Sequence, residues 1–89
     1  MRKPVRREKL LCDNGKPAIL CYYLRRDRSF GVEVELLREN ECERAALCDL
    51  SSEERVVRAL LERFARNSVT PVALREVWEE AAAAQSIPP

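Results

Sequence analysis

Four cysteines are the side chains of this sequence best suited to chemistry, because cysteine can bind a metal, form a disulfide or act as a nucleophile. Cys12 and Cys21 flank the turn-like stretch 13–16, and Cys42 and Cys48 follow later. Their spacing contains no CxxC knuckle, and the chain has no histidine, which argues against a zinc site. We therefore expect no metal and no cofactor, and thiols that stay reduced in the cytoplasm.

The turn geometry also argues against a disulfide within the first hairpin. The dipeptide Asn14-Gly15 is a strong hairpin signal, because a type I′ turn requires positive φ at both central residues. A two-residue loop at this point pairs Cys12 with Pro17. Cys12 and Cys21 then lie four residues apart along the hairpin, roughly 13 Å at about 3.3 Å per residue. This separation is too large for a disulfide between them.

The other side chains offer little for catalysis. The lack of histidine removes the commonest general base and the partner that activates a serine or cysteine nucleophile. The carboxylate pairs Glu33/Glu35 and Glu79/Glu80 are expected to be exposed, and exposed carboxylates keep ordinary pKa values. With only two glycines, the chain cannot form a glycine-rich phosphate loop. We expect a protein that is not an enzyme, with no catalytic residue and no small-molecule substrate.

Charge is distributed unevenly along the chain. Residues 1–28 contain nine Lys/Arg and three Asp/Glu, whereas residues 29–89 contain seven and twelve. Such a basic segment can follow a phosphate backbone, with Tyr22 or Tyr23 available for stacking. It is also the expected composition of a solvated sheet face or a protected edge strand. The candidate basic patch consists of Arg6, Arg7, Lys9, Lys16, Arg25, Arg26 and Arg28.

The elements that must position these residues begin with β-strands. In the stretch 30–36, apolar residues alternate with Glu33 and Glu35, a pattern typical of a strand with one buried and one solvated face. Polar turns around 25–29 and 38–41 separate it from its neighbours. Strands are expected over residues 5–12, 17–24, 30–36 and 43–50.

After Ser51 the apolar spacing becomes helical. The stretch 51–54 predicts a capping box, with Ser51 as N-cap and Glu54 reaching back to its amide. The helix should end at Asn67-Ser68, and a second should begin with Thr70 as N-cap and Pro71 at its first position. The core-facing stripes are Val56, Val57, Leu60, Leu61 and Phe64 in the first helix, and Leu74, Val77, Trp78 and Ala81 in the second.

These elements predict an α+β fold in a single domain spanning residues 1–89. An antiparallel β-meander of about four strands, within residues 5–50, is followed by two C-terminal helices, within residues 51–84, packed on one face. About residues 1–4 and 85–89 should fray. No apolar run is long enough for a signal-peptide core or a membrane span, so we expect a cytoplasmic protein with no membrane partner.

Two stretches resemble a family of short clostridial, Gram-positive proteins of unknown function. They are YYLRRDRSFGVEVEL, residues 22–36, and LCDLSSEERVVRALLERFARNSVTPVALREVWEE, residues 47–80. The matching features are a tyrosine-containing strand, an aromatic-Gly-apolar start to the next strand, and a V-T/S-P-x-x-L-x-x-V restart, here Val69 to Val77. The resemblance implies this fold and a bacterial cytoplasmic origin. It implies no activity, substrate or functional residue.

Function is therefore inferred by exclusion. The leading hypothesis is a small non-enzymatic protein-interaction module of the bacterial cytoplasm, which binds another protein or a second copy of itself through a sheet edge or an exposed helix face. The alternative is a nucleic-acid-associated protein that uses the basic N-terminal hairpin. A third, more remote hypothesis is a metal- or redox-responsive thiol switch.

Overall fold

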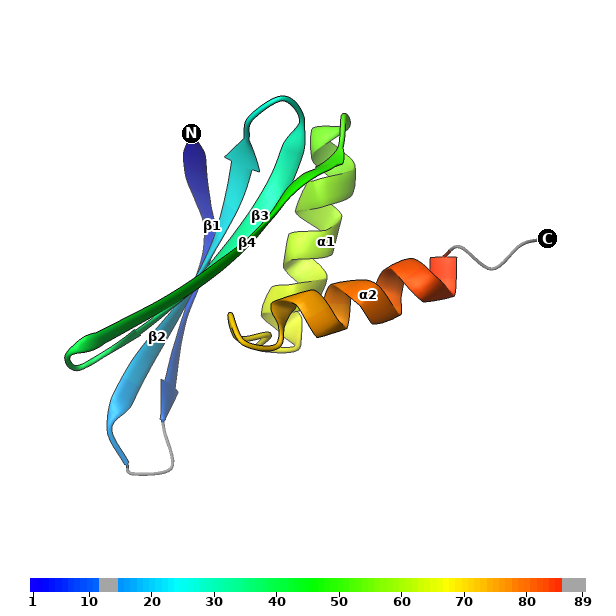
Figure 1. Ribbon diagram of the computed structural model, residues 1–89. Helices are drawn as coiled ribbons and strands as arrows, with labels where there is room; N and C mark the ends of the chain where they lie inside the picture. The colour runs from blue at the N-terminus through cyan, green and yellow to red at the C-terminus, as the bar shows by residue number, and fades with distance from the viewer. Residues whose placement is uncertain (12–14, 86–89) are drawn as a thin grey trace.

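A computed structural model describes residues 1–11 and 15–85 of the chain (Figure 1). Its elements are β1 (Arg2–Leu11), β2 (Pro17–Arg26), β3 (Phe30–Arg38), β4 (Glu41–Ser51), α1 (Glu54–Arg66) and α2 (Leu74–Gln85). The strands form one antiparallel sheet in the order β1-β2-β3-β4. The predicted α+β meander followed by two C-terminal helices is confirmed. Among the described residues, no helix is long and apolar enough to cross a membrane.

The hydrophobic core lies between the sheet and α1, which contacts all four strands. Alternate residues of β2 and β3 point toward α1, because successive side chains of a strand face opposite sides of the sheet. The helix contributes its own apolar stripe to the same layer. The largest fully buried side chains are Leu20, Tyr22, Val32, Val34, Val57, Leu61 and Leu74.

The register of the first hairpin differs from the prediction by one residue. Leu11, not Cys12, lies opposite Pro17, so the predicted two-residue loop is wrong. Cys12, Asp13 and Asn14 themselves lie outside the described residues. The physical reason is the core: a one-residue slip moves every side chain to the other face. In the observed register Leu10 pairs with Ala18 on the face toward α1, whereas the predicted register would turn Leu10 away from it.

The first strand also begins earlier than expected, at Arg2. Residues 2–4, which we expected to fray, pair with the end of β2. The register shifts between Pro4 and Arg6, which makes Val5 a bulge residue that packs partly against the core. A proline and a bulge on an edge strand both hinder pairing with a further strand. The β1 edge is therefore poorly suited to β-augmentation.

The first helix begins at Glu54, so the capping box predicted at Ser51 is wrong. Pairing with Phe30 keeps Ser51 extended as the last residue of β4. Its Oγ accepts the N–H of Glu53 at 3.1 Å, and Glu53 is the N-cap without a side-chain cap bond. The carboxylate of Glu54 accepts from Arg58 Nε at 2.8 Å instead of reaching back to the cap.

The predicted end of α1 at Asn67 is confirmed. Ser68 follows with φ of 50°, the left-handed conformation that usually selects glycine. Its N–H donates to the carbonyl of Ala65 at 3.1 Å, and the N–H of Val69 donates to the carbonyl of Phe64 at 3.0 Å. These two bonds form a Schellman motif, which satisfies the last carbonyls of the helix and reverses the chain.

The second helix begins at Leu74, later than the predicted start at Pro71. Residues 71–73 form a turn in which the carbonyl of Thr70 accepts the N–H of Ala73 at 3.1 Å. Leu74 is buried, whereas Trp78 is only half-buried. The second helix contacts β4 and then points away from the sheet (Figure 1). Residues 86–89, which were expected to fray, lie outside the described residues.

Candidate interaction surface

Both helices lie on the side of the sheet that carries its buried apolar residues. The opposite face of the sheet carries a different set of side chains. Residues directly opposite each other in an antiparallel pair lie on the same face, so the register defines this set. We call it the open face, because no described helix packs on it (Figure 1). Its members include Arg2, Arg7, Lys9, Ile19, Cys21, Tyr23, Arg25, Glu33, Glu35, Leu37, Cys42 and Arg44.

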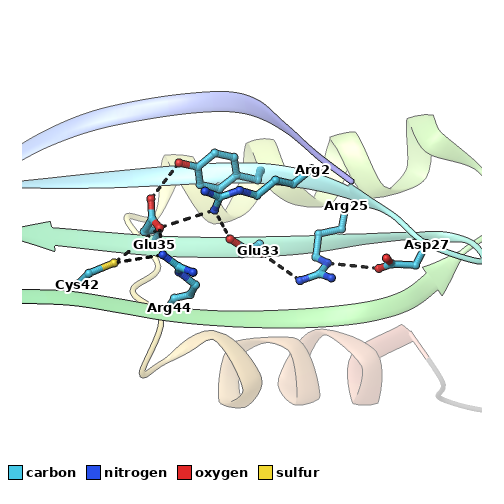
Figure 2. A network of polar contacts seen from close by, with 8 residues as sticks. Arg2, Arg25, Asp27, Glu33, Glu35, Cys42 and Arg44 are labelled. Atoms are coloured by element: carbon cyan, nitrogen blue, oxygen red, sulfur yellow. Dashed lines mark hydrogen bonds and ion pairs between the residues drawn. The ribbon is translucent and has the colours of Figure 1, made fainter.

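Two carboxylates at the centre of the open face are buried, contrary to expectation. Glu33 and Glu35 are each 5% exposed. The predicted alternation placed them on the correct face, but the prediction that they are solvated is wrong. Figure 2 shows the reason: Arg2 of β1, Arg25 of β2 and Arg44 of β4 fold over the two glutamates. Buried carboxylates require such partners, since an unpaired buried charge is very unfavourable.

Glu33 of β3 binds one arginine from β1 and one from β2. Its Oε2 accepts from Nη1 of Arg2, and its Oε1 accepts from Nη1 of Arg25 at 3.1 Å. Arg25 Nε also donates to Oδ2 of Asp27 at 3.3 Å. The Arg2 guanidinium lies 4.1 Å from the ring centroid of Tyr23, a cation–π contact. These contacts hold the start of β1 against the sheet.

Glu35 of β3 contacts side chains of both neighbouring strands, β2 and β4. Its Oε1 accepts from Tyr23 Oη at 3.0 Å, and its Oε2 lies 3.0 Å from Arg44 Nη2 and 3.6 Å from Cys42 Sγ. Arg2 Nη1 is 3.7 Å from the same Oε2 (Figure 2). Burial opposes ionisation, but the hydrogen bond from Tyr23 and the charges of Arg2 and Arg44 outweigh it. Together they hold the pKa of Glu35 below its ordinary value.

Both tyrosines are already engaged. Tyr22 is fully buried in the core, and its Oη donates to the carbonyl of Val69 at 3.0 Å. Burial raises the pKa of Tyr22 above its ordinary value. Tyr23 lies beneath Arg2, and burial, followed by the hydrogen bond to Glu35, raises the pKa of Tyr23 to about 12. Tyr22 is therefore inaccessible for stacking with a base, and Arg2 already occupies one face of Tyr23.

Part of the candidate basic patch faces away from the open face. Arg6 lies opposite Tyr22 on the side of the helices, and its Nη2 is 2.6 Å from Oε2 of Glu62 in α1. Arg26 pairs with Phe30 on that same side, and its guanidinium lies 5.8 Å from the ring centroid. These two arginines therefore do not belong to one surface with Arg25.

The other members of the patch are spread along the sheet. Arg7 and Lys9 lie on the open face, and neither forms an ion pair with another described residue. Lys16 precedes β2 and pairs with Glu39 at 2.8 Å, whereas Arg28 lies in the turn after β2. Of the patch, Arg7, Lys9 and Arg25 share the open face, which also carries Arg2 and Arg44.

A shallow hollow of about 440 Å³ lies on the open face next to Arg7. Apolar groups form most of its surface, and Arg7 is among the residues that line it. A hollow of this composition can receive an apolar side chain whose neighbours are acidic. It is lined by Pro4, Val5, Arg6, Arg7, Cys21, Tyr23 and Leu37.

The described cysteines are free thiols. Cys21 is buried, whereas Cys42 and Cys48 are exposed, and Cys12 lies outside the described residues. Within the described ranges, no three metal-ligating side chains come close enough to hold an ion. The register places Cys21 opposite Arg7. The contact of Cys42 with Glu35 makes this thiol part of the polar network rather than an isolated group.

Sequence reasoning missed the partners of the two glutamates. Arg2 was assigned to a frayed end, and Arg44 was given no role within the expected strand 43–50. One signal was present: two glutamates on the same face of a central strand require cations on the flanking strands. Arg44 lies directly opposite Glu35. The bulge at Val5, which brings Arg2 into line with β2, has no comparable local signal.

A second hollow, of about 400 Å³, lies on the other side of the sheet, where α1, α2 and the end of β4 meet. We call it the helix groove. Val56, predicted to face the core, is 49% exposed because it points into this groove rather than toward the sheet. The groove is lined by Leu50, Ser51, Val56, Val57, Ala59, Leu60, Arg63 and Trp78.

Comparison with known proteins gives a family and no function. No curated protein and no solved structure matches the chain. A family described as a family of unknown function, DUF6514, matches residues 1–84. The match includes the whole sheet, α1 and all but the last residue of α2. The chain therefore belongs to the DUF6514 family, in agreement with the resemblance to a family of unknown function.

Proposed function

We propose that this protein is a small non-enzymatic protein-interaction module of the bacterial cytoplasm, and that its open face binds an acidic segment of another protein. One observation carries the proposal: an uncovered sheet face holds three arginines in place through buried glutamates, and the same face has an apolar hollow lined in part by Arg7 and Tyr23. The cysteines in the described part of the chain are free thiols, which suits a reducing compartment.

The arginines of the open face are preorganised. Arg2, Arg25 and Arg44 are each held by Glu33 or Glu35 beneath them. A guanidinium has five N–H donors, and these contacts use only some of them. The side chains of Arg2 and Arg44 remain 40% and 58% exposed, so their other donors can reach a partner carboxylate. Preorganisation lowers the entropy lost when a partner binds.

Charge complementarity favours an acidic partner. The open face carries the cations Arg2, Arg7, Lys9, Arg25 and Arg44 above two buried carboxylates. Arg7 and Lys9 have no ion-pair partner among the described residues, and Arg7 lines the hollow. A surface of this sign steers acidic partners and repels basic ones.

A protein partner fits this surface better than nucleic acid. Single-stranded nucleic acid binding depends on aromatic faces that stack with bases. Tyr22 is buried, and Arg2 covers one face of Tyr23. Arg6 and Arg26 point to the other side of the sheet, which divides the basic residues that a phosphate backbone would follow.

The same network supports a non-catalytic role. A general acid or base needs a pKa near the working pH and access to a substrate. The pKa of Glu35 is shifted in the opposite direction, and its oxygens are engaged by Tyr23, Arg44 and Cys42. The chain has no histidine to take over the role.

The test is affinity capture combined with a defined probe. Tagged protein is incubated with lysate of the source organism, with and without nuclease, and retained proteins are identified by mass spectrometry. In parallel, fluorescence anisotropy compares a peptide of alternating Glu and Leu, a peptide of alternating Lys and Leu, and a single-stranded oligonucleotide. We expect nuclease-resistant capture of an acidic protein and salt-sensitive binding of the Glu-Leu peptide alone.

Matched variants locate the surface. The double variant Arg7→Glu/Lys9→Glu should lose both the captured protein and the Glu-Leu peptide. The control Arg55→Glu/Arg75→Glu makes the same change in net charge at exposed helix positions and should retain both. Equal binding by the two variants, or retention of nucleic acid in place of protein, would overturn the proposal.

A further inference from the structure

The helix groove is an open apolar surface on the side of the sheet opposite to the proposed partner site. In Figure 1, α1 lies along the sheet while α2 turns away from it, so the two helices diverge and leave the groove between them. Val56 is 49% exposed, and Leu50, Leu60 and Trp78 are half-buried around it. These four side chains give the groove an apolar lining that a second helix would cover.

The two helices that border the groove carry opposite charges. On α1, the exposed cations are Arg55, Arg63 and Arg66, and of these Arg63 lines the groove. Arg63 forms no ion pair with another described residue. On α2, the exposed charged side chains are three carboxylates, Glu76, Glu79 and Glu80, and one cation, Arg75. None of the three carboxylates forms an ion pair in the described part of the chain.

A helix that fits the groove must therefore present an apolar stripe bordered by carboxylates. The second helix of this chain has that composition. Its stripe of Val77, Trp78 and Ala81 is only half-buried in the monomer, and Glu80 borders it. The small side chain of Ala81 permits close approach of two helices, whose axes pack about 8–10 Å apart depending on the side chains in contact.

We propose that a second copy of this chain occupies the helix groove, in a two-fold dimer in which α2 of each protomer lies beside α1 of the other. A two-fold interface uses the same patch on both subunits. Each Arg63 therefore meets an α2 carboxylate of the partner, and the apolar stripe of each α2 is covered by the helix groove of the partner. This dimer leaves the open face free. It is independent of the proposed function, which uses the other side of the sheet.

The experiment is sedimentation velocity over a wide range of protein concentration. Trp78 is the sole tryptophan and lies in the groove, so its fluorescence reports the same event. We expect a monomer–dimer equilibrium, with the emission of Trp78 moving to shorter wavelength as dimer forms. A monomer at every concentration would overturn the proposal.

Charge reversal then identifies the surface. Arg63→Glu should weaken dimerisation on the order of tenfold, because the change occurs at two equivalent sites. Adding Glu76→Arg, Glu79→Arg and Glu80→Arg to Arg63→Glu should restore it. Arg7→Glu, on the open face, makes the same single charge change and should leave the dimer intact. Weakening by Arg7→Glu instead of Arg63→Glu would place the dimer interface on the open face and overturn the proposal.

An apolar variant provides an independent check. Val56→Asp should abolish the dimer, and since Val56 is half-exposed in the monomer, the fold should persist in circular dichroism. A folded Val56→Asp protein that still dimerises with unchanged affinity would also contradict the proposal.

Discussion

Gly31 lies directly against the backbone of Cys48. A Cβ placed on Gly31 would be 3.0 Å from the Cα of Cys48, and closer still to the carbonyl oxygen of Leu47. The approach arises because β4 places three residues, 48–50, opposite this single glycine of β3. At the same bulge, Asp49 has φ of 54°. Glycine is required here for close approach of two backbones.

Replacing Gly31 by alanine should therefore destabilise the fold by about 3 kcal/mol, the upper end of the usual range for overpacking. The obstructing atoms are backbone and cannot move to another rotamer. Urea denaturation measures the change. Gly15→Ala is the matched control: it has open space around it and only the strain of φ at 77°, so it should cost about 1 kcal/mol. Equal losses for the two variants would contradict the steric explanation.

Tyr22→Phe should cost about 1–2 kcal/mol of unfolding free energy. It removes the hydrogen bond from Tyr22 Oη to the carbonyl of Val69 and leaves this carbonyl without that donor. Because Val69 belongs to the link between the helices, hydrogen exchange should accelerate there more than in β2 and β3. A variant as stable as the wild type would show that the bond contributes nothing.

Acid should destabilise the protein partly through Glu35. Its folded pKa lies below the ordinary value of 4.5, so its contribution to stability is present above that value and is lost as the pH falls through the folded pKa. Glu35→Gln should cost about 1–2 kcal/mol at neutral pH and should flatten the acid limb of a stability profile measured with urea. Glu80→Gln, at an exposed position, should leave the limb unchanged.

The tyrosines of the folded protein should ionise at a higher pH than those of the unfolded chain. The folded pKa of Tyr23 is about 12, above the ordinary value of 10.0. Its contribution to stability is therefore complete below pH 10.0 and declines as the pH rises toward the folded pKa. Absorbance of the native protein near the tyrosinate band should show little ionisation at the ordinary pKa. Half-ionised tyrosine in a folded sample at that pH would be inconsistent with this environment.

Ser68→Gly should stabilise the protein by up to about 1 kcal/mol, because glycine adopts the left-handed conformation without steric strain. The gain is reduced by the loss of the exposed bond from Ser68 Oγ to Glu8, at 3.2 Å. Ser68→Val should destabilise it, since a β-branched residue is disfavoured at φ of 50°. Thermal unfolding of both variants checks the sign, and stabilisation by valine would contradict the argument.

Local pattern was sufficient for the order and type of the elements. The alternation around Glu33 and Glu35 predicted β3 and its two faces, because side-chain direction in a strand depends only on position along it. The helical spacing predicted α1 and its end at Asn67. Two features at element starts were misjudged: Ser51 is held in β4 by Phe30, and α2 begins after a turn at Pro71.

The tertiary structure decided the properties of the candidate surfaces. Whether Glu33 and Glu35 are solvated depends on Arg2 and Arg44, which lie on other strands of the sheet. The fold brings these arginines next to the two glutamates. The register of β1 depends on covering the core with Leu10, and not on the turn residues alone. Sequence by itself determined which side chains of one strand share a face, since that follows from local geometry. The register between strands, burial and pairing required contacts that only the folded chain brings together.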